Sequence, residues 1–464
     1  MHIIMISRFV LKMKREGNAG TLCRKRLNWL NSVRNLANLV ARKPLSLILL
    51  FALLARLLLL DTSYVFWDEA EYLMDARLIA TGDTNYDTMS YRPPLVPLLL
   101  APFYRDEFLA RALFVLINSM SVLFAYLLAR RLSERAGLIA AALLAIMPFH
   151  LLFSHYLMTD SIAMLLSMAC VHFYLGSKPW HAYAGGAMLS LAILCKFTSL
   201  AVLPVILLIF LYNDIPSRHI PGSLGLAFVL FVPYLIYNQV AFGHPLFAFL
   251  NGFRIINIPE PPSIAGIAFM LFDMLNIVLF IVFFIGAYKA LSRRNRTGVI
   301  MFIWFLLMLL IFIVLVQRGV DKPPGIEWLS ERFLLPAVPP FFALVAYGLS
   351  RLKPMVAALI VLIALFAWFP AYSRLLVPAI DHEGGLRHVT KEMGTYLSDV
   401  DAAIYCKGNC PPVAYYSGKD VQIIYGGEEV GDGIIVLFND PKQGILEFKK
   451  NSSKSALYLT SDLR

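Results

Sequence analysis

The chain has 464 residues, of which 59% are hydrophobic and only 15% are charged, and its formal net charge is +11 at pH 7. A soluble chain of this length would need a larger polar surface, so the composition indicates a polytopic membrane protein. The positive charge does not require a nucleic-acid partner, because basic cytoplasmic loops explain it. The sequence lacks a Walker motif, a Rossmann glycine fingerprint and a serine elbow, which argues against a soluble nucleotide-sugar donor.

Residues 1–43 form a basic segment with ten Lys or Arg and one Glu. The segment has no short apolar region that ends in a small-residue cleavage site, so we expect no removed signal peptide. Lys and Arg that flank a first span favour the cytoplasmic side of the membrane. We therefore expect a cytoplasmic N-terminus.

The region 44–371 is expected to form the transmembrane domain, because a bilayer core of about 30 Å is crossed by roughly 20 apolar residues in a helix. Eleven apolar runs in this region qualify as spans. They are 44–60, 108–129, 136–151, 159–176, 181–195, 198–212, 220–240, 264–290, 298–317, 333–350 and 354–371. The two short runs on either side of Lys196 could be separate spans joined by a loop or one long kinked helix.

The orientation of the spans follows from the basic residues in the short loops. The N-terminal segment and the loops 130–135, 289–296 and 351–353 are rich in Lys and Arg, and all fall on one side of the membrane, which is predicted to be cytoplasmic. With an odd number of spans, the loop 61–107 and the C-terminal region then lie on the extracytoplasmic side of the cell membrane.

The loop 61–107 is acidic, with nine carboxylates against three arginines, which gives a net charge of −6. Within it, Trp67 to Thr81 has apolar residues at helical spacing and carboxylates along another side, which predicts an amphipathic helix that ends near Gly82. We expect this helix to lie in the membrane interface. A Tyr-Arg-Pro-Pro sequence ending at Pro94 then leads into the next apolar stretch.

Residues 372–464 have the composition of a soluble region, and short strand patterns that alternate with helical ones predict a small α/β domain outside the membrane. Its expected helices are 385–398 and 413–416, and its expected strands are 402–406, 421–425, 433–438 and 456–460. Cys406 and Cys410 are close enough in sequence to form one disulfide, with two free thiols as the alternative.

Ionisable residues at membrane depth are costly and are therefore candidates for function. Each candidate also has an ordinary explanation: the acids could cap helices, Lys196 could extend to the interface, and the arginines could contact lipid phosphates. Their position in different segments of one face favours a shared site. The candidates are the carboxylates Asp68, Glu69 and Asp160 and the cations Arg92, Lys196 and Arg332.

A carboxylate beside several cations suits a particular chemistry. The carboxylate could deprotonate an acceptor, and the cations could bind a phosphate whose negative charge grows as it leaves. His150 and His155 lie near Asp160 in the sequence but have no third close ligand, so we favour interfacial aromatic residues over a metal site. If a divalent cation is used, Asp68, Asp160 and His155 are its candidate ligands.

The ordered set of motifs resembles the GT-C superfamily of integral-membrane glycosyltransferases, nearest to the protein O-mannosyltransferases and the aminoarabinose lipid A transferase. The motifs are the Asp-Glu pair at 68–69, Arg-Pro-Pro at 92–94, Met-Thr-Asp at 158–160, Lys196 and Arg-Phe-Leu-Leu-Pro at 332–336. They cover roughly residues 44–350. The region lacks a large β-trefoil insertion of the kind found in the eukaryotic mannosyltransferases, and the C-terminal domain is shorter than in many relatives.

The resemblance implies transfer of a sugar from a dolichyl or undecaprenyl phosphate to a protein, lipid or glycan acceptor, with inversion of the anomeric centre. By the same resemblance, Asp68 would be the general base and Glu69 would lie beside it in the acceptor site. Asp160 would orient the acceptor or the sugar. Arg92, Lys196 and Arg332 would bind the phosphate. No cofactor is implied beyond a divalent cation in some members.

Two other classes of protein remain open from the sequence. A transporter or lipid flippase would also place charges among its helices, but it should show repeat symmetry and charges near the midplane of the bilayer. A receptor that binds its ligand with the C-terminal domain would not need the loop carboxylates. The position of the candidates at the outer ends of the spans favours the enzyme.

Overall fold

The computed structural model of the protein divides the chain into two compact units, residues 1–51 and residues 52–464. The residues that it describes are 43–60, 65, 67–84, 88–212, 219–255, 264–317, 327–376, 384–407, 410–423, 433–440, 443–450 and 453–460. The predicted basic segment therefore lies outside the described residues except for Lys43.

Residues 44–212 fold mostly into helices joined by short turns. In chain order they are α3 (Pro44–Leu58), α4 (Trp67–Thr81), α5 (Leu95–Leu100), η1 (Ala101–Phe103), α6 (Glu107–Ala129), α7 (Glu134–Ile146), α8 (Pro148–Phe153), α9 (Thr159–Tyr174), α10 (Pro179–Cys195), η2 (Phe197–Val202) and α11 (Leu203–Tyr212). Helix α4 has the bounds predicted from the sequence. It ends where Gly82 takes a left-handed conformation, with φ of 76°.

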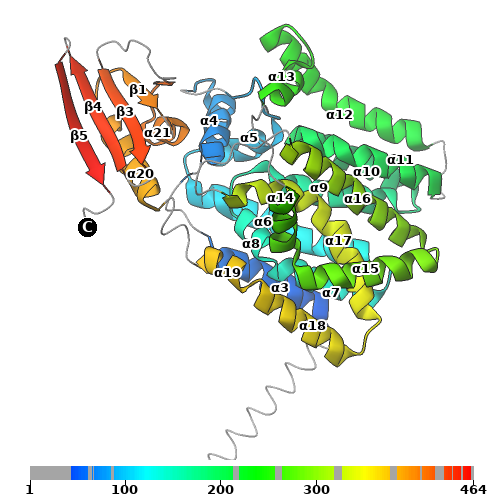
Figure 1. Ribbon diagram of the computed structural model, residues 1–464. Helices are drawn as coiled ribbons and strands as arrows, with labels where there is room; N and C mark the ends of the chain where they lie inside the picture. The colour runs from blue at the N-terminus through cyan, green and yellow to red at the C-terminus, as the bar shows by residue number, and fades with distance from the viewer. Residues whose placement is uncertain are drawn as a thin grey trace, which may run out of the picture. The chain divides into compact units, whose positions relative to one another are not determined.

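The helices continue to residue 376. They are α12 (His219–Phe242), α13 (Phe247–Ile255), α14 (Ile264–Leu275), α15 (Ile277–Ser292), α16 (Arg296–Gln317), η3 (Glu327–Ala337), α17 (Val338–Ser350), α18 (Pro354–Ala367) and α19 (Phe369–Leu376). Helices α10 and α12 pack together, as do α15 and α17 (Figure 1).

Four helical segments among the described residues are long and apolar enough to cross a membrane: Glu107–Ala129, His219–Phe242, Arg296–Ile313 and Arg332–Ser350. Four shorter apolar helices are Pro44–Leu58, Phe197–Tyr212, Ile277–Ser292 and Pro354–Ala367. The chain is thus mostly helical with several apolar helices, as the sequence predicts for an integral membrane protein. The number of eleven spans stays a prediction.

Some predicted spans are divided in the structure, and one open alternative is decided. The run 264–290 is divided into α14 and α15 at Asn276, which has a positive φ of 69° and accepts a hydrogen bond from the Val278 amide. Asparagine tolerates this conformation and caps helices well, which explains the break. At Lys196 the backbone is extended, and η2 leads into α11, so a turn separates the two short runs there.

Helix α4 differs from the predicted amphipathic helix in one respect. Its carboxylates Glu69, Glu71 and Asp75 are buried together with its apolar residues. A helix in the membrane interface would keep such groups in water, because an unpaired buried charge is costly. Residues 69–76 of α4 are therefore packed inside the protein, and the acids among them need partners there.

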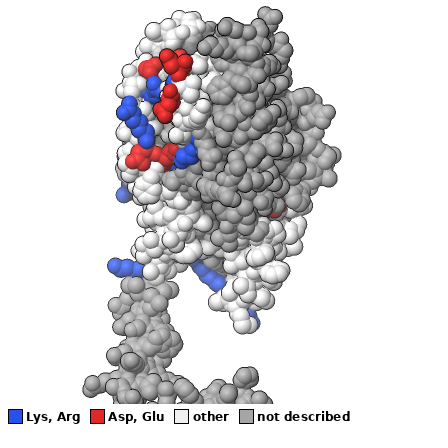
Figure 2. Space-filling view, turned by 90° about the vertical axis from the view of Figure 1, so that its left-hand side faces the viewer, with Lys and Arg blue, Asp and Glu red and all other residues white. Residues whose placement is uncertain are grey.

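Charged groups lie at opposite ends of α9. Asp160 lies in the first turn of α9, whereas Arg131 donates hydrogen bonds to the carbonyl oxygens of His172 and Leu175 at the other end of that helix. The 16 residues of α9 span about 24 Å. On the face in Figure 2, acidic and basic side chains gather near the top, separate basic side chains lie lower down, and most of the described surface between them is uncharged. The basic turns and the acidic region are thus separated by an apolar body.

The C-terminal region forms a five-stranded sheet with strand order β2-β1-β3-β4-β5 (Figure 1). Strand β1 runs parallel to β2 and β3, while β4 pairs antiparallel with both β3 and β5. The elements are α20 (Gly384–Ser398), β1 (Ile404–Lys407), α21 (Cys410–Ser417), β2 (Val421–Ile423), β3 (Gly433–Asp440), β4 (Gln443–Lys450) and β5 (Ser453–Thr460). Strand β4 was not expected from the sequence.

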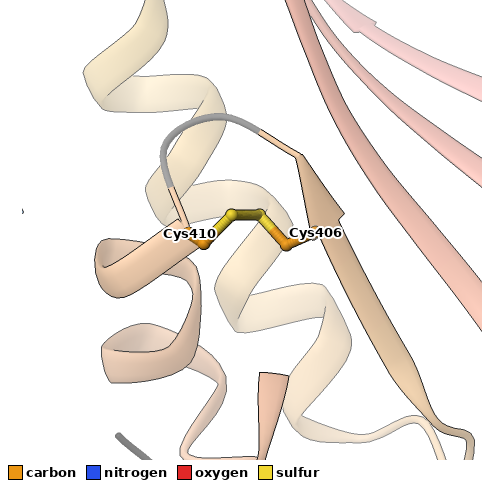
Figure 3. Close-up of a disulfide and its surroundings, with 2 residues drawn as sticks. All are labelled: Cys406 and Cys410. Atoms are coloured by element: carbon orange, nitrogen blue, oxygen red, sulfur yellow. A yellow bond between two sulfur atoms is a disulfide. The ribbon is translucent and has the colours of Figure 1, made fainter. Parts of the chain in front are cut away.

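A disulfide joins Cys406 on β1 to Cys410 at the start of α21 (Figure 3). The two Cα atoms are 5.6 Å apart, and both residues are buried. The sequence left open a disulfide or two free thiols, and the structure has the disulfide. The disulfide fixes the first turn of α21 next to the sheet.

Helix α21 packs against α4. Leu73 and Ala70 of α4 belong to the same buried apolar cluster as Val413 and Ala414 of α21. The Val65 amide, just before α4, donates a hydrogen bond of 2.8 Å to the Tyr416 hydroxyl. The C-terminal domain therefore supports the helix that carries the acidic residues.

The contact between α15 and α17 depends on Gly286. A β-carbon at this position would overlap the carbonyl oxygen of Leu344 on α17. We expect Gly286→Ala to push the helices apart and to lower stability by about 1–3 kcal/mol. Melting temperatures in detergent measure the effect. Gly225→Ala in α12 is the control, because a β-carbon there meets nothing within 4 Å. Equal melting temperatures for the two variants would contradict the assigned packing.

Candidate active site

Asp68 lies in the first turn of α4, between two arginines. Its Oδ1 accepts a hydrogen bond of 2.7 Å from Arg92 Nη2, and its Oδ2 accepts one of 2.6 Å from Arg332 Nη1. The three side chains are 16–18% exposed. Both carboxylate oxygens are thus engaged, in a place that a small group can reach.

The loop after α4 directs Arg92 back toward Asp68. Asp75 accepts hydrogen bonds from the Thr88 amide at 2.9 Å and from the Thr88 hydroxyl at 2.5 Å. The Thr88 carbonyl then accepts the amides of Tyr91 and Arg92 in a turn. The Arg92 guanidinium lies 4.7 Å from the ring centre of Tyr72 on α4, a cation–π contact. A buried acid and an aromatic ring therefore set the position of this cation.

Arg332 and Lys196 both contact the ring of Phe333. The Arg332 guanidinium is 5.2 Å from the ring centre of Phe333, and the Lys196 ammonium is 4.7 Å from the same centre. Lys196 also forms an ion pair with Asp160 in the first turn of α9. The structure thus brings together Asp68, Asp160, Arg92, Lys196 and Arg332, five of the six residues that the sequence selects.

Glu69 is the exception, because its side chain points away from this cluster. Its carboxylate is fully buried and accepts hydrogen bonds of 2.6 and 3.1 Å from the two Nη atoms of Arg111 on α6. Glu69 Oε1 also accepts the Leu157 amide at 2.8 Å. The expected position in an acceptor site needs correcting, because every one of these contacts is internal.

Glu71, which the sequence analysis did not select, belongs to the cluster instead. Its carboxylate forms an ion pair with Arg92 and accepts hydrogen bonds from Trp67 Nε1 at 2.9 Å and from the Tyr91 hydroxyl at 3.2 Å. A spacing of three residues places Glu71 on the same helical face as Asp68. That spacing was the available signal, whereas the adjacent Glu69 faces another side.

The two carboxylates of the cluster have opposite electrostatic environments. Burial disfavours the charge on Asp68, but Arg332 and Arg92 outweigh burial and hold the pKa of this carboxyl well below its ordinary value. Burial raises the pKa of Glu71, Arg92 opposes the rise, and Asp68 adds to it. Asp68 is therefore charged in this state, and Glu71 is the more basic of the pair.

The cluster can bind an anion. The Nε atoms of Arg92 and Arg332 are buried and have no hydrogen-bond partner among the described residues. Guanidinium groups match phosphate geometry through paired N–H donors. In the described part of the chain no three His, Cys, Asp or Glu side chains are grouped to bind a metal ion. The candidate metal ligands Asp68, Asp160 and His155 are therefore not assembled into such a group there.

A segment of the chain that contributes residues to this cluster matches a known family model. Residues 92–237, less than half of the chain, match the family model described as dolichyl-phosphate-mannose-protein mannosyltransferase. This segment includes Arg92, Asp160 and Lys196. No curated protein sequence matches the chain.

Two solved structures have a similar fold. ArnT from Cupriavidus metallidurans, bound to undecaprenyl phosphate, is 14% identical, with a TM-score of 0.64 over 90% of this chain and 98% of that one. An oligosaccharyltransferase from Archaeoglobus fulgidus, in complex with Zn and sulfate, is 13% identical, with a TM-score of 0.54 over 81% of this chain and 62% of that one. Both are GT-C glycosyltransferases, so the resemblance inferred from the sequence is confirmed at the level of the fold.

The opposite shifts of Asp68 and Glu71 predict different pH dependences of stability. Because the pKa of Glu71 is raised on folding, its stabilising effect is lost as pH rises above about 4.3, the ordinary pKa of glutamate. Glu71→Gln should therefore gain melting temperature relative to the wild type as pH rises above about 4.5.

Asp68→Asn is the matched control for this experiment. The lowered pKa of Asp68 confines its titration to the range below about 3.9, the ordinary pKa of aspartate, so its effect on stability should be constant above about pH 4.5. Parallel melting curves of Glu71→Gln and the wild type across this range would show that Glu71 does not titrate as described.

Proposed function

We propose that the protein is a membrane glycosyltransferase that moves a sugar from a polyprenyl phosphate to a protein, lipid or glycan acceptor on the extracytoplasmic side. The observation that carries the proposal is the pairing of Asp68 with Arg92 and Arg332, next to the ion pair of Asp160 with Lys196. A carboxylate among three cations suits the transfer of a group away from a phosphate. The undecaprenyl phosphate bound to ArnT supports this class of donor.

Arg332, Arg92 and Lys196 would bind the donor phosphate. The buried Nε groups of both arginines supply hydrogen-bond donors beyond those that Asp68 and Glu71 accept. When the bond between the sugar and the phosphate breaks, its electron pair stays on the phosphate oxygen. Cations already in place stabilise this growing charge at no cost of reorganisation.

Asp68 would act as the general base. Its two hydrogen bonds to arginines make it a weak base in the ligand-free state. The donor phosphate competes for the same arginines, so its binding frees a carboxylate oxygen and makes Asp68 more basic. The acceptor hydroxyl then gives its proton to Asp68 while its oxygen attacks the anomeric carbon from the side opposite the phosphate. This direct displacement inverts the anomeric centre.

Asp160 and Lys196 complete the site. Asp160 keeps Lys196 close to Phe333 and hence to Arg332. Once Lys196 turns to the phosphate, the Asp160 carboxylate becomes available to accept hydrogen bonds from sugar or acceptor hydroxyls. The same carboxylate would therefore first position the cation and then orient a substrate.

The location on the extracytoplasmic side has two supports. The cluster lies at the end of α9 opposite to the basic turn that contains Arg131, and basic turns favour the cytoplasm. The disulfide of the C-terminal domain suits an oxidising compartment. A transporter or flippase is the alternative. It is disfavoured because Asp68 and Asp160 lie in the first turns of their helices, whereas transporters bind substrates near the midplane.

Removing the base should abolish transfer. We expect Asp68→Asn to fold and insert normally but to lower turnover by about 10²–10⁴-fold, the usual contribution of general base catalysis. Mass spectrometry of lipid-linked sugars and glycoconjugates in a deletion strain that carries the variant provides the readout. Asp83→Asn, in the same loop and 71% exposed, is the control. Near-normal products with Asp68→Asn would refute the base assignment.

Removing the cations should weaken donor binding. Arg332→Gln and Lys196→Gln each delete charge-assisted hydrogen bonds, so we expect affinity for undecaprenyl phosphate to fall about tenfold or more. The affinity is measured by titrating purified protein with undecaprenyl phosphate. Arg77→Gln, which removes a charge from the exposed pair of Arg77 on α4 with Asp83, should have no effect. Unchanged affinity in both site variants would rule out the phosphate site.

A further inference from the structure

We propose that Glu69 and Arg111 are positioning residues: their buried ion pair sets the place of the α8–α9 turn, residues 154–158, and through it the geometry of the donor-phosphate site. This inference rests on the proposed function and deepens it. The pair itself touches neither donor nor acceptor, because Glu69 is 0% exposed and Arg111 is 1% exposed.

The ion pair binds the main chain of the turn from two sides. Arg111 Nη1 donates to the His155 carbonyl at 3.1 Å, and Glu69 Oε1 accepts the Leu157 amide at 2.8 Å. The two side chains also bind each other with both Nη atoms and both carboxylate oxygens. Helices α4 and α6 are thereby joined to the same three residues of backbone, 155–157.

The same turn has further polar contacts at its beginning. Ser154 Oγ accepts a hydrogen bond of 3.0 Å from Arg56 Nε on α3, and the Ser154 carbonyl accepts one of 2.9 Å from Asn118 on α6. These contacts hold the first residue of the turn. Glu69 and Arg111 hold its middle, next to the residues that enter the site.

Two of the three residues that follow this backbone contact the proposed site. The Met158 sulfur lies 3.3 Å from Arg332 Nη1, and Asp160 forms the ion pair with Lys196. A shift of residues 155–157 would therefore move Asp160 and its cation relative to Asp68. The position of Glu69, adjacent to Asp68 in α4, ties both carboxylates to one rigid helix.

Stability alone does not explain a buried ion pair. Replacing such a pair with well-packed apolar side chains is often neutral for stability, because the desolvation of two charges offsets their attraction. What apolar side chains cannot replace is the pair of hydrogen bonds to the backbone at His155 and Leu157. A double replacement therefore separates positioning from stability.

The test uses the full-length protein in detergent, with undecaprenyl phosphate as the probe. Glu69→Leu and Arg111→Leu alone should each lower the melting temperature strongly, because each leaves a buried charge without its partner. The double variant should recover most of the melting temperature. Its Kd for undecaprenyl phosphate should nevertheless be raised about tenfold to a hundredfold, because the cations are displaced.

The control is the exposed pair between Arg77 on the same helix and Asp83 just after its end. Arg77→Gln combined with Asp83→Asn removes an ion pair of 2.8 Å and should change neither the melting temperature nor the Kd. A double Leu variant with wild-type melting temperature and wild-type Kd would overturn the positioning role. The proposed function would still stand after that result, provided that Arg332→Gln raises the Kd in the same assay. Unchanged affinity in Arg332→Gln would instead count against the phosphate site itself.

Should the double variant fail to fold, Arg111→Lys decides the question. It keeps the positive charge opposite Glu69 but loses the planar fork that binds both carboxylate oxygens and the His155 carbonyl. We expect a folded protein with a raised Kd for undecaprenyl phosphate. A folded Arg111→Lys protein with the wild-type Kd would overturn the inference.

Discussion

The Asp68 carboxylate lies between two arginines that are 24 and 264 residues away along the chain. In a protein made largely of apolar helices, each of these charges would be costly if it were buried alone. Their mutual pairing makes burial tolerable and also assembles the site before any ligand arrives. An incoming phosphate would then exchange partners with Asp68 rather than recruit cations from elsewhere. The pairs that allow the segment to fold are thus the groups that the proposed reaction uses.

Local patterns in the sequence were enough to predict that the protein is built mainly of apolar helices. Apolar runs of membrane length predicted the helices, and the bounds of α4 followed from its helical spacing and from Gly82. The breaks were harder to predict. Asn276 divides an apolar run because its side chain caps α15 and its amide donates to the Ala364 carbonyl, a contact between distant segments. Strand β4 was missed because its main evidence is its pairing with β3 and β5.

The residue types of the site could also be predicted from the sequence, but the partner of each residue could not. Five of the six selected residues converge, because charged residues at the ends of apolar helices are costly unless they pair with one another. The spacing of three residues placed Glu71 on the helical face of Asp68, but the sequence could not name the partner of Glu69, since Arg111 lies 42 residues away. Only the packing of α6 and of the α8–α9 turn against α4 assigns Glu69 to the interior and Glu71 to Arg92.

The central claim is that cations from three distant segments bind one lipid-borne phosphate beside Asp68. The most direct measurement is an experimental structure of the protein in a lipid nanodisc with undecaprenyl phosphate. The account predicts phosphate oxygens at about 3 Å from nitrogen atoms of Arg332 and of Lys196 or Arg92. It also predicts that at least one Asp68 oxygen is released from its arginine. A phosphate bound at the opposite end of α9, with both Asp68 pairs intact, would contradict it.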